Sequence, residues 1–322
     1  MSSATPRPTT IIVVGSANQD YIVRVTAPPA PGETVLAKSI LRQPGGKGAN
    51  QAVAAARMRD NVSFVASVGD DADGAFLLRE LRSEGVDTTN VEIIHRGHTG
   101  LALVSVFDSG ENSITVVPGT NFGLKADRVR DTVRRLARES EGAIMVIQGE
   151  VLPEIIDIAL RTAHESGARS ILNLAPFQEL SPELLAICDP LVVNEGEASA
   201  LIGWEVKDAP SAGRAVEQLR AVTKSVVVTI GAEGAYWGDA HGAAHIPAPV
   251  GRPVVDTTGA GDAFVGALAA LLARGSSLEQ AVEVGVRAGT HAVGSPGAQS
   301  SYPTLADLDL DYAAAPHDAP VR

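Results

Sequence analysis

Short apolar runs with strand character alternate with segments of helical periodicity along most of this chain. The runs are rich in Val and Ile, whereas the segments between them repeat apolar residues every three to four positions. Strands are predicted at 11–15, 63–68, 101–107, 143–148, 170–174, 191–194 and 225–230. Helices are predicted at 48–58, 72–83, 124–139, 153–165, 181–187, 195–202, 211–223, 261–274 and 277–293. Ser276 and Glu279 have the spacing of a capping box at the start of the last helix.

This alternation predicts an α/β fold with a mostly parallel central sheet that is covered by helices on both faces. Two stretches, 16–45 and 91–120, are rich in Thr, Val, Gly and Pro and show little helical period. They are predicted to form a small accessory β-sheet that projects from the main body. The expected organisation is one domain over 10–309, with flexible termini at 1–9 and 310–322.

Composition and charge narrow the choice of partners. The chain has 322 residues, and only 4% are aromatic, so its core must consist mainly of Ala, Val, Leu and Ile. A formal net charge of −12 argues against nucleic acid or an anionic membrane as a partner. Cys188 is the single cysteine, which excludes an intrachain disulfide. No signal segment and no apolar stretch of about 20 residues is visible, so we expect a cytoplasmic protein.

Two glycine-rich stretches do not match the common phosphate-binding motifs. The stretch 43–58 contains a Gly-Lys pair, but Leu41 stands where a Walker A loop has its first glycine, and Gly48 replaces the required Ser or Thr. In 259–266, Phe264 occupies the position of the third glycine of the dinucleotide-binding fingerprint. A P-loop enzyme and an NAD-dependent oxidoreductase are therefore both disfavoured.

The stretch DTTGAGD (256–262) still has the features of an anion site. Gly259, Ala260 and Gly261 precede a predicted helix, whose first N–H groups lack partners and favour a negative ligand. A tight turn in which Asp262 stabilises the helix dipole is the alternative. A phosphate on these N–H groups would repel the carboxylate of Asp262 unless that group takes a proton, which favours a general base.

Six motifs together resemble the PfkB-type carbohydrate kinase family. They occur in that family's order and span nearly the whole chain: GSANQD (15–20), PGETV (31–35), GGKGANQAVAAARM (45–58), NEGEA (194–198), TIGAEG (229–234) and DTTGAGD (256–262). The resemblance implies an α/β kinase with a small β-sheet lid. It is strongest to the members that transfer the γ-phosphoryl group of MgATP to the primary hydroxyl of D-ribose, giving D-ribose 5-phosphate and ADP.

The resemblance also implies roles for individual residues. Asp262 matches the base that deprotonates the sugar, and Gly259, Ala260 and Gly261 match the backbone anion hole. The residues that match the sugar site, together with Asp262, are Asn18, Asp20, Gly46, Lys47, Asn50 and Glu150. The residues that match the nucleotide site are Asn194, Thr229, Gly231 and Gly234. Those that match a K⁺ site are Asp256, Thr258, Ala292, Gly297 and Ser301.

Asn194 and Glu197 match the family's NxxE motif, which acts on Mg²⁺ through water. Capping of the helix at 195 is the alternative explanation of this pair. The lid implies a homodimer, in which Ala102 and Val104 would line the sugar site of the neighbouring protomer.

Other functions within and outside the family stay open. A ketose, sugar-acid, deoxyribose or nucleoside kinase would use the same chemistry, and so the substrate is less secure than the reaction. Tyr21 is the only aromatic residue between 11 and 60, which weakly favours a plain sugar over a nucleoside. A non-catalytic sugar or nucleotide sensor is disfavoured because Asp262, Asn194 and Glu197 are all present.

Overall fold

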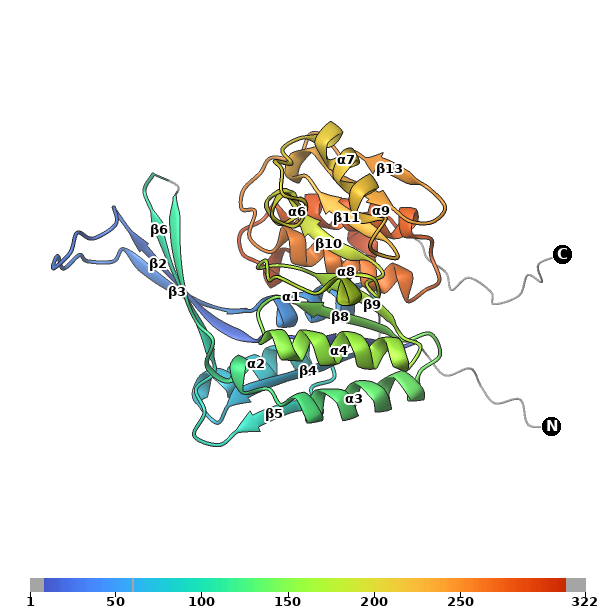
Figure 1. Ribbon diagram of the computed structural model, residues 1–322. Helices are drawn as coiled ribbons and strands as arrows, with labels where there is room; N and C mark the ends of the chain where they lie inside the picture. Colours follow the sequence, from blue (N-terminus) through green and yellow to red (C-terminus); the bar gives the residue numbers. More distant parts are fainter. Residues whose placement is uncertain (1–8, 60, 110, 311–322) are drawn as a thin grey trace.

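A large twisted sheet forms the centre of the computed structural model, which describes residues 9–59, 61–109 and 111–310 (Figure 1). Within these residues it has nine strands in the order β13-β12-β11-β10-β9-β8-β1-β4-β5. Its strands are β1 (Ile11–Val14), β4 (Val62–Gly69), β5 (Val91–Ile94), β8 (Ile144–Gln148), β9 (Arg169–Asn173), β10 (Leu191–Asn194), β11 (Val226–Thr229), β12 (Ala235–Gly238) and β13 (Ala243–Ile246). All neighbours pair in parallel except the β11–β12 and β12–β13 pairs. The predicted mostly parallel α/β sheet is confirmed.

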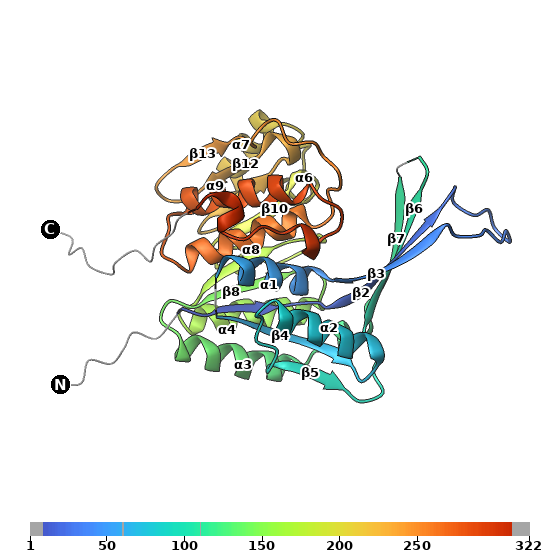
Figure 2. The same ribbon diagram turned by 180° about the vertical axis from the view of Figure 1, so that it is seen from behind.

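Helices bury both faces of this sheet, which explains why its inner strands are continuously apolar. Along β1, Ile11 and Val13 face one core, and Ile12 and Val14 face the other. The first core is closed by α1 (Lys47–Met58), α2 (Ala72–Ser83), α8 (Ala260–Leu272) and α9 (Leu278–Ala292). The second is closed by α3 (Ala126–Glu139), α4 (Pro153–Glu165), α5 (Pro182–Leu185), α6 (Glu195–Ile202) and α7 (Ala209–Leu219). Figure 2 shows α1 and α8 side by side on the first face, where the two helices pack together.

A second, four-stranded sheet projects from one side of the body in both views (Figures 1 and 2). It consists of β2 (Asn18–Val25), β3 (Ser39–Gly45), β6 (Gly100–Phe107) and β7 (Asn112–Val117), in the order β3-β2-β6-β7. The prediction of an accessory sheet is correct for these strands, but Val91–Ile94 was wrongly assigned to it. That segment is β5, and it pairs in parallel with Ala66–Gly69 at the edge of the large sheet, with Val91 buried.

Two further details differ from the expectations. The capping box of α9 is formed by Ser277 and Gln280, one residue later than predicted, because Leu278 is buried as the first helical residue. The hairpin of β12 and β13 had no predicted counterpart. Of the termini predicted at 1–9 and 310–322, residues 1–8 and 311–322 lie outside the described residues. Among the residues described, no helix is long and apolar enough to cross a membrane.

Candidate active site

The amino end of α8 carries the carboxylate that the sequence singles out. Gly259 precedes the helix with a φ of 76°, and no side chain among the described residues caps the first turn. Asp262 lies in that turn and is only 6% exposed. The Ala260 N–H bonds to the Thr257 carbonyl at 3.3 Å, whereas a Cβ on Gly261 would meet nothing within 4 Å. This uncapped helix start therefore borders open space, which is the arrangement that binds anions.

Two amides on α1 hold the carboxylate of Asp262. Asn50 donates from Nδ2 to Oδ2 of Asp262 at 3.0 Å, and Gln51 donates from Nε2 to Oδ1 at 2.9 Å. Asn50 is itself oriented by Gln299, whose Nε2 donates to Asn50 Oδ1 at 2.9 Å. The structure thus brings together Asn50 and Asp262, which the sequence assigned to one site, although they are 212 positions apart.

Lys47 occupies the centre of a group of carboxylates. Asp262, and to a lesser degree Glu150 and Glu197, raise the pKa of Lys47, while its burial opposes them. The pKa of Asp20 is raised to about 7 by burial, followed by the negative charges of Glu150 and Asp262. An ammonium among several carboxylates matches the mixed donors and acceptors that a polyol requires.

Asp20 and Glu150 differ in how their oxygens are satisfied. Glu150 Oε2 accepts from Ser16 Oγ at 2.5 Å and from the backbone N–H of Lys47 at 2.9 Å. Asp20 Oδ1 is buried and has no hydrogen-bond partner within the described part of the chain. Gly45 is required beside it, because a Cβ there would lie 2.1 Å from Asp20 Oδ2. An orphaned buried acceptor facing the site is a place for a ligand hydroxyl.

Asn18 and Gly46 lie at the base of the small sheet. Asn18 is 4% exposed, and its Oδ1 accepts from Asn121 Nδ2 at 2.7 Å. Gly46 has a φ of 86° and approaches the Asn18 backbone so closely that a Cβ would lie 2.8 Å from its nitrogen. Asn121 therefore orients Asn18, which is a role that the sequence analysis missed.

Asn194 and Glu197 bond to each other at the start of α6. Asn194 Oδ1 accepts from the Glu197 N–H, and Glu197 Oε2 accepts from the Asn194 N–H, both at 2.9 Å. The alternative of a helix cap is therefore correct for this pair. Burial raises the pKa of Glu197, although the Asn194 hydrogen bond and Lys47 oppose that rise. Glu197 also raises the pKa of Lys47, so its charge acts on the site even though it caps the helix.

The loop after β11 contains the residues that match the nucleotide site. Thr229 ends the strand, and its hydroxyl donates to the Val193 carbonyl at 3.4 Å. Gly231 begins a short 3₁₀ turn and Gly234 follows it, with φ values of 48° and 96°. A Cβ on Gly234 would lie 2.1 Å from the Ile246 carbonyl, so only glycine permits this contact with β13.

Asp256 organises the loop that leads into α8. Its Oδ1 accepts from the N–H and hydroxyl of Thr258, at 2.9 and 2.6 Å, and its Oδ2 accepts from the Gly297 N–H at 2.9 Å. Burial would raise the pKa of Asp256, but these hydrogen bonds outweigh it and lower the pKa. The structure therefore joins Asp256, Thr258 and Gly297. Ala292 ends α9, and Ser301 is buried in the following 3₁₀ turn.

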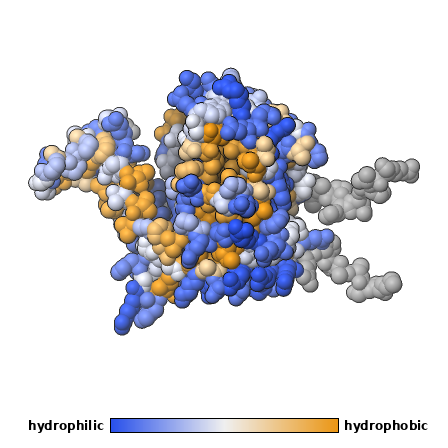
Figure 3. Space-filling model, in the orientation of Figure 1, coloured by the Kyte–Doolittle hydropathy of each residue, from blue (hydrophilic) through white to orange (hydrophobic). Residues whose placement is uncertain are grey.

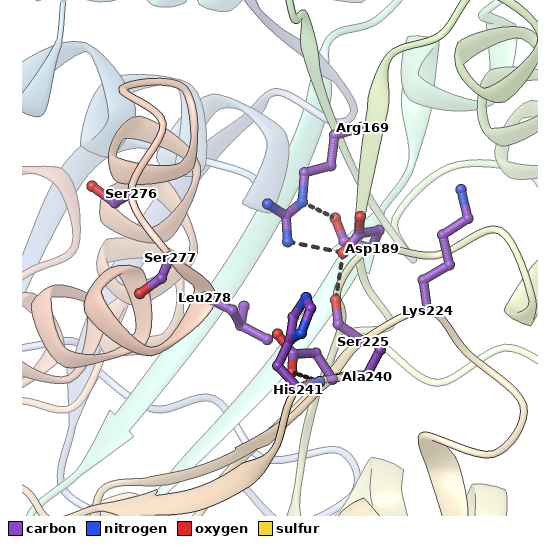
Figure 4. A pocket seen from close by; sticks show the side chains of 10 residues that line it. Arg169, Asp189, Lys224, Ser225, Ala240, His241, Ser276, Ser277 and Leu278 are labelled. Atoms are coloured by element: carbon purple, nitrogen blue, oxygen red, sulfur yellow. Dashed lines mark hydrogen bonds and ion pairs between the residues drawn. The ribbon is translucent and has the colours of Figure 1, made fainter. Parts of the chain in front are cut away.

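A separate cavity of about 430 Å³ lies at the opposite edge of the large sheet (Figure 4). It opens where β9 begins at Arg169, whereas the site above lies at the carboxyl ends of the strands. Asp189 pairs there with Arg169 at 2.9 Å and accepts from Ser225 Oγ at 2.5 Å. These groups satisfy each other, so we assign the function to the site around Asp262.

Comparison with known proteins places this site in a family. The family model described as pfkB family carbohydrate kinase matches residues 8–305. The chain therefore belongs to the pfkB family of carbohydrate kinases, which are sugar phosphotransferases.

Within that family its relatives include ribokinases. The chain is 35% identical over 314 residues to a ribokinase from Schizosaccharomyces pombe, covering 94% of this chain and 97% of the relative. It is 33% identical over 304 residues to a deoxyribokinase from Salmonella typhi, covering 92% and 96%. It is also similar to the structure of Arabidopsis thaliana ribokinase complexed with ribose and ATP, with a TM-score of 0.85, 30% identity, and coverage of 94% and 97%.

Proposed function

We propose that this protein transfers the γ-phosphoryl group of MgATP to the primary hydroxyl of D-ribose, giving D-ribose 5-phosphate and ADP. One observation carries the proposal: a buried aspartate, Asp262, is held by two amides at an uncapped helix start that borders open space. Phosphoryl transfer depends mainly on positioning and on electrostatic stabilisation, and this arrangement supplies both.

In the proposed reaction, Asp262 takes the proton of the attacking hydroxyl. Its two oxygens each accept one amide hydrogen, from Asn50 and Gln51, which leaves further lone pairs for the proton. Gly259, Ala260 and Gly261 form the turn whose N–H groups stabilise the negative charge that grows on the transferred phosphoryl group. Lys47 adds a positive charge beside the same atoms.

The sugar is held by the ring of polar groups around Lys47. Asp20 Oδ1 accepts from a sugar hydroxyl and thereby gains the partner that it lacks among the described residues. Glu150 is fixed by its bonds to Ser16 and to the Lys47 backbone, and so offers its other oxygen to a second hydroxyl. Asn18 and Gly46 complete the site at the base of the small sheet.

The donor sets fit the two cations that the reaction is proposed to use. Asn194 and Glu197 offer one amide and one carboxylate, a sparse set that suits Mg²⁺ with most of its water retained. Bound Mg²⁺ would neutralise the phosphate charges. Asp256 and Thr258, with backbone oxygens of Ala292, Gly297 and Ser301, form a set of hard oxygens that suits K⁺. Thr229, Gly231 and Gly234 would border the nucleotide.

A homodimer through the small sheet is also proposed. Register places Leu41, Ile22, Val104 and Ile114 in one row across its four strands, and the row two residues earlier contains Asp20 and Ala102. Side chains two residues apart share a face, so this apolar row continues directly from the sugar site. Leu41 and Ile114 are 51% and 58% exposed, and Figure 3 shows apolar side chains gathered where the sheet leaves the body. Such a face suits a second copy of the same sheet.

The test is ADP release from MgATP, with K⁺ present, against D-ribose, 2-deoxyribose, fructose, a sugar acid, adenosine and pseudouridine. We expect the highest kcat/KM with D-ribose. The deoxyribokinase relative makes 2-deoxyribose the second candidate, and its preference over ribose would change the substrate but keep the chemistry. Sugar binding without ADP release from any compound would contradict a kinase and favour a sensor.

A further inference from the structure

A chain of buried amides connects Asp262 to the backbone of the large sheet. Gln51 Nε2 donates to Asp262 Oδ1 and also to Asn173 Oδ1, both at 2.9 Å. Asn173 Nδ2 donates to the Val192 carbonyl at 3.3 Å, and Gln148 Nε2 donates to Gln51 Oε1 at 2.7 Å. Gln51, Gln148 and Asn173 come from α1, β8 and β9, and the family motifs matched in the sequence gave none of them a role.

The Val192 carbonyl ends this series of hydrogen bonds, and it determines which group donates and which accepts in each of them. A backbone carbonyl only accepts, so Asn173 must turn its NH₂ toward Val192 and its oxygen toward Gln51. Gln51 must then donate, and its two amide hydrogens are used by Asn173 and Asp262. Its oxygen is left as an acceptor, which Gln148 satisfies. The amide of Gln51 cannot flip without breaking all three bonds.

Burial makes this arrangement rigid. Gln51 is 1% exposed and Gln148 is 0% exposed, so water cannot replace a broken bond. Gly15 allows Gln148 to approach, because a Cβ there would lie 2.1 Å from Gln148 Oε1. Gln51 therefore presents a single N–H to Asp262 from a fixed point.

We propose that Gln51 is a positioning residue that locks the carboxylate of Asp262 in the orientation needed to take the sugar proton, and that Gln148 and Asn173 fix Gln51 in turn. This inference rests on the proposed role of Asp262 as the base. Asn50 differs from Gln51, since it matches the sugar site and would also contact substrate. Gln51 is buried behind Asp262 and acts only through it.

The experiment is Gln51→Met in the full chain, which keeps the length of the side chain but removes both N–H donors. Misplacement of a reacting group by about 1 Å lowers turnover about 100-fold, so kcat should fall roughly 10–100-fold. KM for sugar and for ATP should change by less than about twofold, because no binding group is removed. Gln280→Met, which changes the exposed capping box of α9, is the control and should leave kcat unchanged.

A double-mutant cycle distinguishes positioning from a general structural role. In an Asp262→Asn background, Gln51→Met should cause little further loss, because the group that it positions is already disabled. Losses in kcat that multiply in the double variant, or a normal kcat for Gln51→Met, would overturn the inference while leaving the proposed function intact. Near-normal turnover of Asp262→Asn would instead remove the base, and this inference with it.

A second variant keeps the test decisive if Gln51→Met does not fold. Gln148→Met leaves Gln51 in place and removes only the donor to its oxygen. It should lower kcat less than Gln51→Met, again with KM unchanged, and melting temperatures identify the folded variants. An unchanged kcat for Gln148→Met, or a rise in KM without a fall in kcat, would contradict the proposal that Gln148 fixes Gln51.

Discussion

Replacement of Asp20 by asparagine should make the protein more stable and its sugar affinity weaker. Burial, with Glu150 and Asp262 nearby, raises the pKa of Asp20 from 3.8 to about 7. Between these values the folded protein keeps a proton that the unfolded chain has lost, so the free energy of unfolding falls as the pH rises. Above pH 7 both states are ionised, and the folded protein carries the full cost of the buried charge.

The size of the effect follows from this change in pKa. Asparagine has the shape of the protonated acid and never ionises. With about 1.4 kcal/mol for each tenfold change in an acidity constant, the variant should be more stable by about 4 kcal/mol at pH 8 but by only about 1.5 kcal/mol at pH 5. The difference in the free energy of unfolding between variant and parent should therefore grow by about 2.5 kcal/mol from pH 5 to pH 8.

Urea unfolding at pH 5 and pH 8, followed by the fluorescence of Trp204 and Trp237, measures both free energies. Asp131→Asn on the exposed side of α3 is the matched control and should show no such growth. Calorimetry should show sugar binding weakened roughly 10–100-fold, because the amide oxygen of asparagine accepts a weaker hydrogen bond than the charged carboxylate does. A stability difference that is equal at both pH values, or a less stable variant at pH 8, would refute the reasoning.

Three further predictions concern the base, the cation and the dimer. Asp262→Asn should lower turnover about 10²–10⁴-fold while sugar still binds; near-normal turnover in a coupled ADP assay would exclude it as the base. Activity should be higher in K⁺ than in Na⁺ at equal ionic strength, and Asp256→Ala should abolish the difference; an equal rate in both salts contradicts the K⁺ site. Ile114→Asp should give monomers in sedimentation velocity, whereas Ser113→Asp on the opposite face should not. If both variants stay dimeric, the interface lies elsewhere.

The central strands and most helices could be predicted from the sequence because burial on both sides leaves an unmistakable apolar run. The strands at the edges give a weaker signal, although the central β1, β10 and β11 are equally short at four residues each. β1 is buried throughout, whereas β13 is only half-buried and β5 has a single buried residue, so the place of an edge strand depends on its neighbour rather than on its own composition. The capping box of α9 was predicted one residue too early, because Ser276 with Glu279 and Ser277 with Gln280 both have the required spacing.

The carboxylate proposed as the base could be located from the sequence, but Gln51, which also holds it, could not. Asp262 follows a glycine turn at a helix start, which is a local signal with a physical meaning. Gln51 gives no such signal, because an amide on an apolar helix has no preferred partner until the chain folds. Its partner Asp262 lies 211 positions away. Its other partner, Asn173, reaches it only because β9 lies beside β8 in the folded sheet.

During synthesis, the apolar face of α1 stays uncovered until α8 has been made, because the two helices pack against each other. A Cβ on Gly266 would lie 2.4 Å from Ala54 Cβ, so the two helices pack in close contact. Ribosomes release the amino end first, and α1 therefore emerges some two hundred residues before the helix that covers it. The nascent chain carries Lys47 and Asn50 on an unsealed apolar surface throughout that interval. Such a surface favours aggregation until α8 emerges, and Asp262 reaches Asn50 and Gln51 only when synthesis is nearly finished.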